Sequence, residues 1–276
     1  MGLRIMNNVS AVFAQRQLGN NTHNLQKSLE RLSSGYRINH ASDDAAGLAV
    51  SEKMRFQIRG LEQAQRNVQD GISLVQVAEA GLQESTDILQ RIRVLSVQAA
   101  NGTLATSDRQ LIQTEVDQLV SEIDRMQTTV KFNGVSLLAN ASTATGGSIT
   151  LHVGADAGQT LSVVLSNITS TSLGINSLDI TSTTGADSAI SSVDSALRSI
   201  LSLRAKMGAT QNRLEKTYDF LGIQRENMMA SESRIRDVDF ASEMTNYTKN
   251  QILTQASTSM LAQANVSGQA VLQLLG

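Results

Sequence analysis

One spacing in the last third of the chain constrains the fold more than any other feature. Apolar residues recur at intervals of seven over residues 193–235, at Val193, Ile200, Met207, Leu214, Leu221, Met228 and Ile235. Such a repeat is typical of a helix that packs along a seam against other helices. Because the chain contains no proline, nothing in it interrupts a helix sharply. The repeat therefore predicts a helix of about fifty residues, roughly 75 Å long at 1.5 Å per residue.

Two more long helices are expected in the first half. One has an apolar stripe from Met54 to Leu95, and we expect it to begin near Ser42 and to end at Asn101-Gly102. The stretch His40–Asp44 is then a helix cap, with acids in the first turn, rather than a metal or nucleophile cluster. The second helix should open at the capping-box spacing of Ser107–Gln110 and close at Asn133-Gly134.

Residues 141–184 break the helical pattern. They are rich in Ser, Thr and Gly, and two short stretches alternate apolar and polar residues around Ile149–Val153 and Leu161–Leu165. The turn Gly154–Gly158 between them predicts a hairpin. The predicted fold class is therefore mainly α: an elongated rod of long antiparallel helices with coiled-coil seams, plus a small β-hairpin region.

The two ends of the chain carry weaker helical stripes that lack an evident partner. The bulkiest positions are Leu18, Leu25, Leu29 and Leu32 at the front, and Leu253, Met260, Val271 and Leu274 at the back. A helix should stop near Ser33-Ser34-Gly35, with Gly35 in the left-handed conformation. Residues 257–276 contain too many polar side chains for a membrane span. We expect the terminal helices to pair as a coiled coil and to pack against other copies of the chain.

Composition excludes several classes of function. The net charge is −2, which gives no electrostatic footprint for nucleic acid or an acidic membrane. The chain has no cysteine and only three histidines, and no zinc, phosphate-loop or dinucleotide motif appears. We therefore predict no catalytic, cofactor-binding or metal-binding residues, and no enzyme. The first residues lack the apolar core of a secretory signal peptide.

Several stretches together resemble bacterial flagellin. They are Arg31–Asn39, Asp43–Glu52, Leu89–Gln98, Ile235–Ala241 and Gln251–Ala256. The resemblance covers about residues 1–140 and 185–276, without the bulky outer domain that many flagellins insert in the middle. It implies a terminal coiled-coil domain (1–42 and 239–276) that lines the inner tube of a filament. It also implies a helical rod domain (43–140 and 185–238), with 141–184 as its hairpin part.

The resemblance also implies a function and a set of partners. A flagellin polymerises with its own copies into the motility filament after unfolded export through the flagellar secretion channel. Its partners would be a secretion chaperone at the carboxy-terminal arm and the hook-junction and filament-cap proteins. The protein would be secreted into an extracellular filament, or a periplasmic one in a species with internal flagella.

By the same resemblance, Gln90, Arg91, Leu95 and Glu115 occupy positions through which flagellin monomers are recognised by Toll-like receptor 5 and contact a neighbouring subunit along the filament. Val94 stands where many receptor-active flagellins carry Glu. The alternative is that Arg91 is only a solvated surface charge.

Three other functions are alternatives: a hook–filament junction protein, which would form a short ring, a flagellin carrying a metallopeptidase, and a free helical secreted effector. The segment 141–184 contains only His152, which argues against the peptidase.

Overall fold

The computed structural model describes residues 7–139 and 147–275, with side chains described through residue 267. Six helices dominate it: α1 (Val9–Ser34), α2 (Ala45–Ala100), α3 (Thr106–Thr129), α4 (Ser170–Leu173), α5 (Thr183–Arg236) and α6 (Phe240–Leu275). Contacts divide the chain into two units. The terminal unit comprises Met1–Phe56 and Asn227–Gly276, and the central unit comprises Gln57–Glu226. The predicted mainly α class is confirmed.

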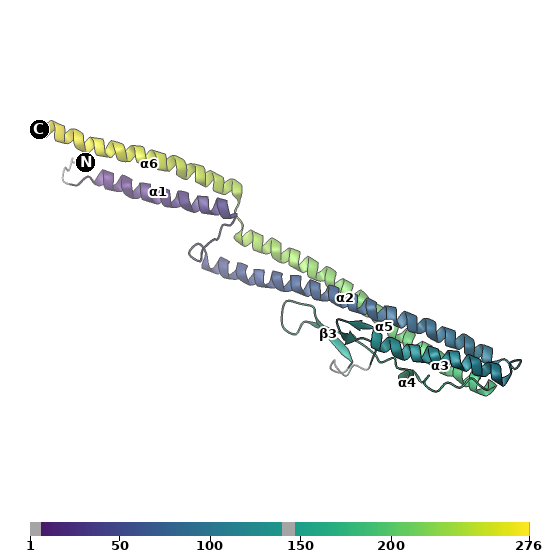
Figure 1. Cartoon of the computed structure of the whole chain (residues 1–276). Helices are drawn as coiled ribbons and strands as arrows, with labels where there is room; N and C mark the ends of the chain where they lie inside the picture. Colours follow the sequence, from purple (N-terminus) through teal and green to yellow (C-terminus); the bar gives the residue numbers. More distant parts are fainter. Residues whose placement is uncertain (1–6, 140–146, 276) are drawn as a thin grey trace. The chain divides into compact units, whose positions relative to one another are not determined.

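In the central unit, α3 and α5 both run antiparallel to α2 around a shared apolar core (Figure 1). Ion pairs show which parts of these helices lie side by side. Arg91 of α2 pairs with Glu115 of α3, and Arg93 of α2 pairs with Asp194 of α5. Arg204 of α5 lies near Glu79, further back along α2. The predicted heptad of α5 supplies one side of the core, and its positions Val193, Ile200, Met207, Leu214 and Leu221 are all buried. The stripe of α2 supplies the other, with Leu82, Leu89 and Ile92 fully enclosed.

Two antiparallel hairpins complete the central unit. Strands β3 (Ser148–His152) and β4 (Thr160–Val164) pair as predicted, whereas residues 141–146 of that segment lie outside the described residues. The prediction for Asn133-Gly134 was wrong. Helix α3 ends at Thr129, and Asn133-Gly134 forms the two-residue turn between β1 (Lys131–Phe132) and β2 (Val135–Ser136). Both turn residues have positive φ, 46° and 81°, which is the geometry that Asn-Gly favours in a tight hairpin.

The terminal unit consists of the antiparallel pair α1 and α6, the adjoining ends of α2 and α5, and two connecting segments. These segments, called the crossings below, are residues 35–44 between α1 and α2 and residues 237–239 between α5 and α6. Helix α1 ends as predicted, because Gly35 adopts a φ of 76° and its N–H bonds to the Arg31 carbonyl at 2.9 Å. The two crossings then pair briefly with each other. Tyr36 and Asp237 form a β-bridge, and the Val238 N–H donates to the Gly35 carbonyl at 3.0 Å.

Two predicted helix starts need correction. Helix α2 begins at Ala45, not near Ser42, because Asp44 accepts a hydrogen bond from the Gly47 N–H at 2.8 Å and so caps the helix. Helix α3 begins at Thr106, so Ser107 lies inside the first turn. The Asp108 carboxylate instead accepts from the Ala105 N–H at 3.3 Å. Within the described residues, no helix combines the length and apolar character that a membrane span requires.

Candidate assembly surfaces

The face that α1 turns toward α6 is small and polar. Its buried or half-buried positions recur every three or four residues: Ala11, Ala14, Leu18, Asn21, Leu25, Ser28 and Leu32. The matching positions of α6 are Glu243, Tyr247, Asn250, Thr254, Ser257, Leu261 and Ala264. In the described part of this pair the fully buried side chains are all polar, namely Asn21, Ser28 and Glu243. The two helices therefore enclose little apolar area against each other.

Polar contacts along this interface show that the two helices run in opposite directions. The Asn8 amide donates to the Ala264 carbonyl at 2.9 Å, near the chain ends. In the middle, the Asn21 amide donates to Ser257 Oγ at 2.9 Å. At the other end, Arg31 and Glu243 form an ion pair at 3.6 Å.

Large apolar side chains of the same two helices are exposed. They include Val12, Phe13 and Leu29 on α1, and Phe240, Met244, Ile252, Leu253, Met260 and Val266 on α6. Of the predicted seam residues, Leu18, Leu25 and Leu32 are half-buried, whereas Leu29 and Leu253 are exposed and Met260 is 64% exposed. Val271 and Leu274 lie beyond the residues whose side chains are described. The role of these residues in assembly stays a prediction.

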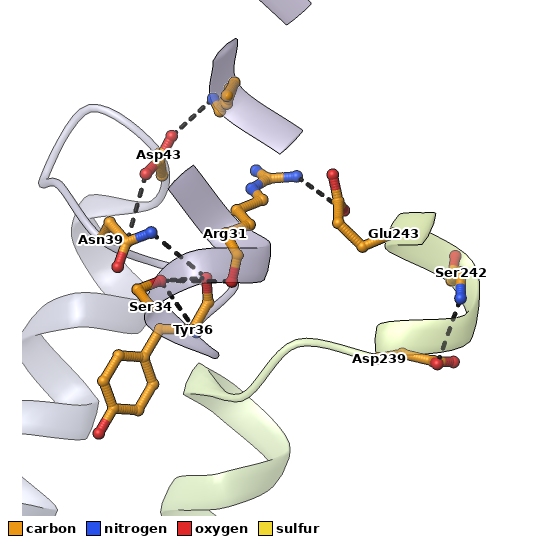
Figure 2. Close-up of polar contacts among 9 residues, drawn as sticks. Arg31, Ser34, Tyr36, Asn39, Asp43, Asp239, Ser242 and Glu243 are labelled. Atoms are coloured by element: carbon orange, nitrogen blue, oxygen red, sulfur yellow. Dashed lines mark hydrogen bonds and ion pairs between the residues drawn. The ribbon is translucent and has the colours of Figure 1, made fainter. Parts of the chain in front are cut away.

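A polar cluster surrounds the crossing that follows α1 (Figure 2). Lys27 forms an ion pair with Asp43 at 2.5 Å. The same carboxylate accepts bonds from the N–H groups of Asn39 and His40, at 3.3 and 3.2 Å. The Lys27 hydrogen bond, helped by these backbone donors, holds the pKa of Asp43 at about 2, below its ordinary value of 3.8. Asp43 therefore ties α1 to the loop that leads into α2.

A second set of contacts ties the two crossings to the helices of the terminal unit. Arg236 bonds to Glu52 at 2.6 Å and stacks on Tyr36, with 4.8 Å to the ring centroid. The bond from Arg236, with a further one from Arg55, lowers the pKa of Glu52. Asp239 caps α6 by accepting from the Ala241 N–H at 3.0 Å. The contacts of Arg236 with Glu52 and Tyr36 join residues that are far apart in the sequence.

On the central unit, the structure brings together only part of the predicted receptor and axial surface. Arg91 reaches Glu115 with two nitrogens, Nε at 2.9 Å and Nη2 at 2.7 Å. Gln90 is exposed, but Leu95 is only 2% exposed and belongs to the core. Leu95 therefore lies in the core of the central unit, and its part in a receptor or axial contact stays a prediction. Exposed apolar neighbours on the same two helices are Val94 and Leu111.

The comparisons with known proteins agree on one family. The bacterial flagellin N-terminal helical region matches residues 5–143, and the flagellin C-terminal helical region matches residues 190–275. The chain is 51% identical to flagellin FlaB1 of Treponema pallidum, with 98% of this chain and 99% of the relative covered. It is 46% identical to the flagellin of Bacillus subtilis, with 99% and 100% covered.

The chain belongs to the bacterial flagellin family. A further relative, the flagellar filament 33 kDa core protein of Treponema phagedenis, is 51% identical over 98% of this chain and 99% of its own length. Among solved structures, the crystal structure of Bacillus cereus flagellin is 33% identical, with a TM-score of 0.52, 60% of this chain and 94% of that chain covered. The relatives are structural filament proteins, and this flagellin is a structural protein rather than an enzyme.

Two of the stretches that resemble flagellin meet in the terminal unit. Arg31–Asn39 and Ile235–Ala241 contain the crossings that pair through the Tyr36–Asp237 bridge. Sequence reasoning found both stretches but not the contact between them, because 200 residues separate Tyr36 from Arg236. It also missed Asn21. The signal was present, since Asn21 lies three residues after Leu18 and four before Leu25.

Proposed function

We propose that this flagellin polymerises with its own copies into the bacterial flagellar filament that serves motility. One observation supports the proposal most directly: the described part of the α1–α6 pair encloses no apolar side chain fully, while large apolar side chains lie on its outside. Such a pair is poorly stabilised alone, because burial of apolar surface is the main force that holds helices together. Repeated contacts between identical subunits that do not close on themselves generate a helical polymer.

Electron microscopy of the purified protein at high concentration tests the proposal. Long tubes are the expected result. Short rings would instead support a hook–filament junction protein, and the absence of any assembly would support a free helical effector.

We extend the family resemblance to export and to the division of the subunit. Residues 1–42 and 239–276 would line the inner tube of the filament, and residues 43–238 would form the outer tube. The protein would be exported unfolded through the flagellar secretion channel, with a chaperone on the carboxy-terminal arm. It would then meet the hook-junction and filament-cap proteins in an extracellular filament, or a periplasmic one. Co-purification of the full chain with the chaperone, lost on removal of residues 240–276, tests the first of these contacts.

A second proposed function is recognition of the monomer by Toll-like receptor 5. The supporting observation is the exposed surface of Gln90, Arg91 and Glu115, in which Arg91 is held by two hydrogen bonds to Glu115. An oriented arginine beside the exposed apolar side chains Val94 and Leu111 is the kind of residue that dominates an interface. The same surface would contact a neighbouring subunit in the filament, so recognition would require the monomer.

A further inference from the structure

We propose that Met244 and Met260 on α6 are oxidation sites through which hydrogen peroxide blocks the assembly of free subunits. The inference rests on the proposed function, because it takes other copies of this chain as the partners that cover the exposed apolar side chains of α6. It assigns to two thioethers a reversible modification that acts on polymerisation and leaves the central unit folded.

The methionines of the described structure differ widely in their access to solvent. On α6, Met244 is 50% exposed and Met260 is 64% exposed. In the core of the central unit, Met126 is 8% exposed and Met207 is 1% exposed. Peroxide must reach the sulfur to oxidise it, so the two sites on α6 should react first. This contrast does not require α1 and α6 to be packed together, because separation of the two helices would leave Met244 and Met260 at least as exposed.

The chemistry is a two-electron transfer of oxygen to sulfur. The Sδ lone pair of methionine attacks one oxygen of hydrogen peroxide, an S–O bond forms, and the O–O bond breaks. The other oxygen leaves as water and takes both hydrogens of the peroxide, so the sulfide is oxidised and the peroxide is reduced. The product is a polar sulfoxide in place of a flexible apolar side chain, and methionine sulfoxide reductases convert it back.

Both methionines belong to the exposed apolar surface of α6. Met244, Ile252 and Leu253 line one surface groove, and Met260 and Val266 are exposed further along the helix. Another copy that covers these side chains would remove them from water. A sulfoxide oxygen that is buried there without a hydrogen-bond donor is costly. Oxidised subunits should therefore associate more weakly, although their central unit keeps its enclosed core.

The test treats the purified full-length monomer with hydrogen peroxide and follows each methionine by mass spectrometry. Trypsin separates the two sites on α6, because Lys249 lies between them, and it releases Met126 and Met207 in two other peptides. We expect Met244 and Met260 to be oxidised about tenfold faster than the two core methionines. The critical concentration for polymerisation should rise about tenfold, with an unchanged thermal unfolding curve. Methionine sulfoxide reductases with dithiothreitol as the reductant should restore the original value.

Substitutions show whether these two sulfurs are responsible. Met244→Leu and Met260→Leu together keep the side chains apolar and of similar volume, so the double variant should polymerise at the parent critical concentration before and after peroxide. The control is Met229→Leu. Met229 lies on α5 and is 50% exposed, the same fraction as Met244. Its replacement should leave the chain as sensitive to peroxide as the parent.

Equal rates of oxidation at the α6 sites and at the core methionines would overturn the assignment of the sites. Normal polymerisation of a chain that is oxidised at both sites would overturn the link to assembly, and so would a double variant that remains sensitive to peroxide. If the untreated parent chain does not polymerise, the proposed function itself fails, and the link to assembly fails with it. The oxidation rates then still show which methionines peroxide reaches.

Discussion

The α1–α6 pair and the core of the central unit are both built from long antiparallel helices, yet they differ in what they enclose. The central unit buries heptad positions such as Ile200 and Leu214 completely, together with Leu89 of α2. The terminal pair buries Asn21, Ser28 and Glu243, and leaves Met260 and Phe13 exposed. Helices of similar periodicity therefore differ in where their apolar side chains lie. The helices of the central unit enclose theirs within a single chain, whereas α1 and α6 present large apolar side chains outward.

We expect the largest effect from removing part of α6, in the terminal unit. Deletion of residues 257–276 should abolish polymerisation, because it removes the second half of α6, while the central unit keeps its own core in Gln57–Glu226. Electron microscopy and the thermal unfolding curve of the truncated chain check the two halves of this prediction. Normal long filaments from the truncated protein would show that the end of α6 is not needed for assembly.

Two matched leucine-to-alanine substitutions should show that the two regions contribute differently to the free energy of unfolding. Leu89→Ala removes a fully buried side chain and should lower the free energy of unfolding by about 2–5 kcal/mol. Leu253→Ala removes a side chain that is 38% exposed in the monomer and should change it much less, while weakening polymerisation. Urea unfolding of both variants, followed by far-UV circular dichroism, measures the difference. Equal losses in the two variants would contradict the comparison.

The terminal helices should also open first. Because their apolar burial does not offset roughly 1–2 kcal/mol of backbone entropy per residue, mild trypsin should cut the monomer at Arg16, Lys27, Arg31 or Lys249. The same sites should be spared in the polymer, where other copies cover them. Arg204 of the central unit serves as the internal control and should resist cleavage in both states. Equal protection of the terminal sites in monomer and polymer would rule out early opening.

Arg91→Ala should act on binding rather than on folding. Its pair with Glu115 is exposed, so the free energy of unfolding should change little. If Arg91 is an interface hot spot, its removal should cost about 2 kcal/mol of binding free energy and weaken binding to Toll-like receptor 5 roughly thirty-fold. Filament stability should fall as well. Arg125→Ala, which breaks an exposed pair within α3, is the control. Unchanged signalling and motility in Arg91→Ala would leave Arg91 as a surface charge only.

The smallest expected effect concerns acid. The folded-state pKa of Asp43 is about 2, below the ordinary value of 3.8, so the folded chain binds this proton less readily than the unfolded chain. The Lys27–Asp43 contact therefore contributes stability that is fully present above pH 3.8 and is lost as the pH falls toward 2. Asp43→Asn should remove this part of the acid dependence. The urea midpoints of the parent and the variant, measured between pH 5 and pH 2, check this prediction. If the two midpoints fall by the same amount with pH, Asp43 does not contribute to the acid dependence.

Some features of the fold could be predicted from the sequence because the determining interactions are local or strictly periodic. The seven-residue repeat predicted α5, and the structure shows a helix of 54 residues. Gly35 ends α1 because only a left-handed residue completes that cap. Alternation around Ile149 and Leu161 predicted the β3–β4 hairpin. Local signals were less decisive at Asn133-Gly134, where the same dipeptide can end a helix or turn a hairpin.

Periodicity, composition and motifs were enough to predict the class of the fold, the approximate length of α5 and the resemblance to flagellin. Which side of each terminal helix faces its partner came from the packing of the folded chain. A three- or four-residue spacing defines a stripe, but in α6 two stripes one residue apart both have that spacing, and the one that contains Thr254, Ser257 and Leu261 faces α1. Its contacts include the hydrogen bond between Asn21 and Ser257, which are 236 residues apart in the chain. The two kinds of sequence reasoning disagreed about Leu95, which the resemblance placed at a contact surface and the apolar stripe from Met54 to Leu95 placed in the core; the structure buries it.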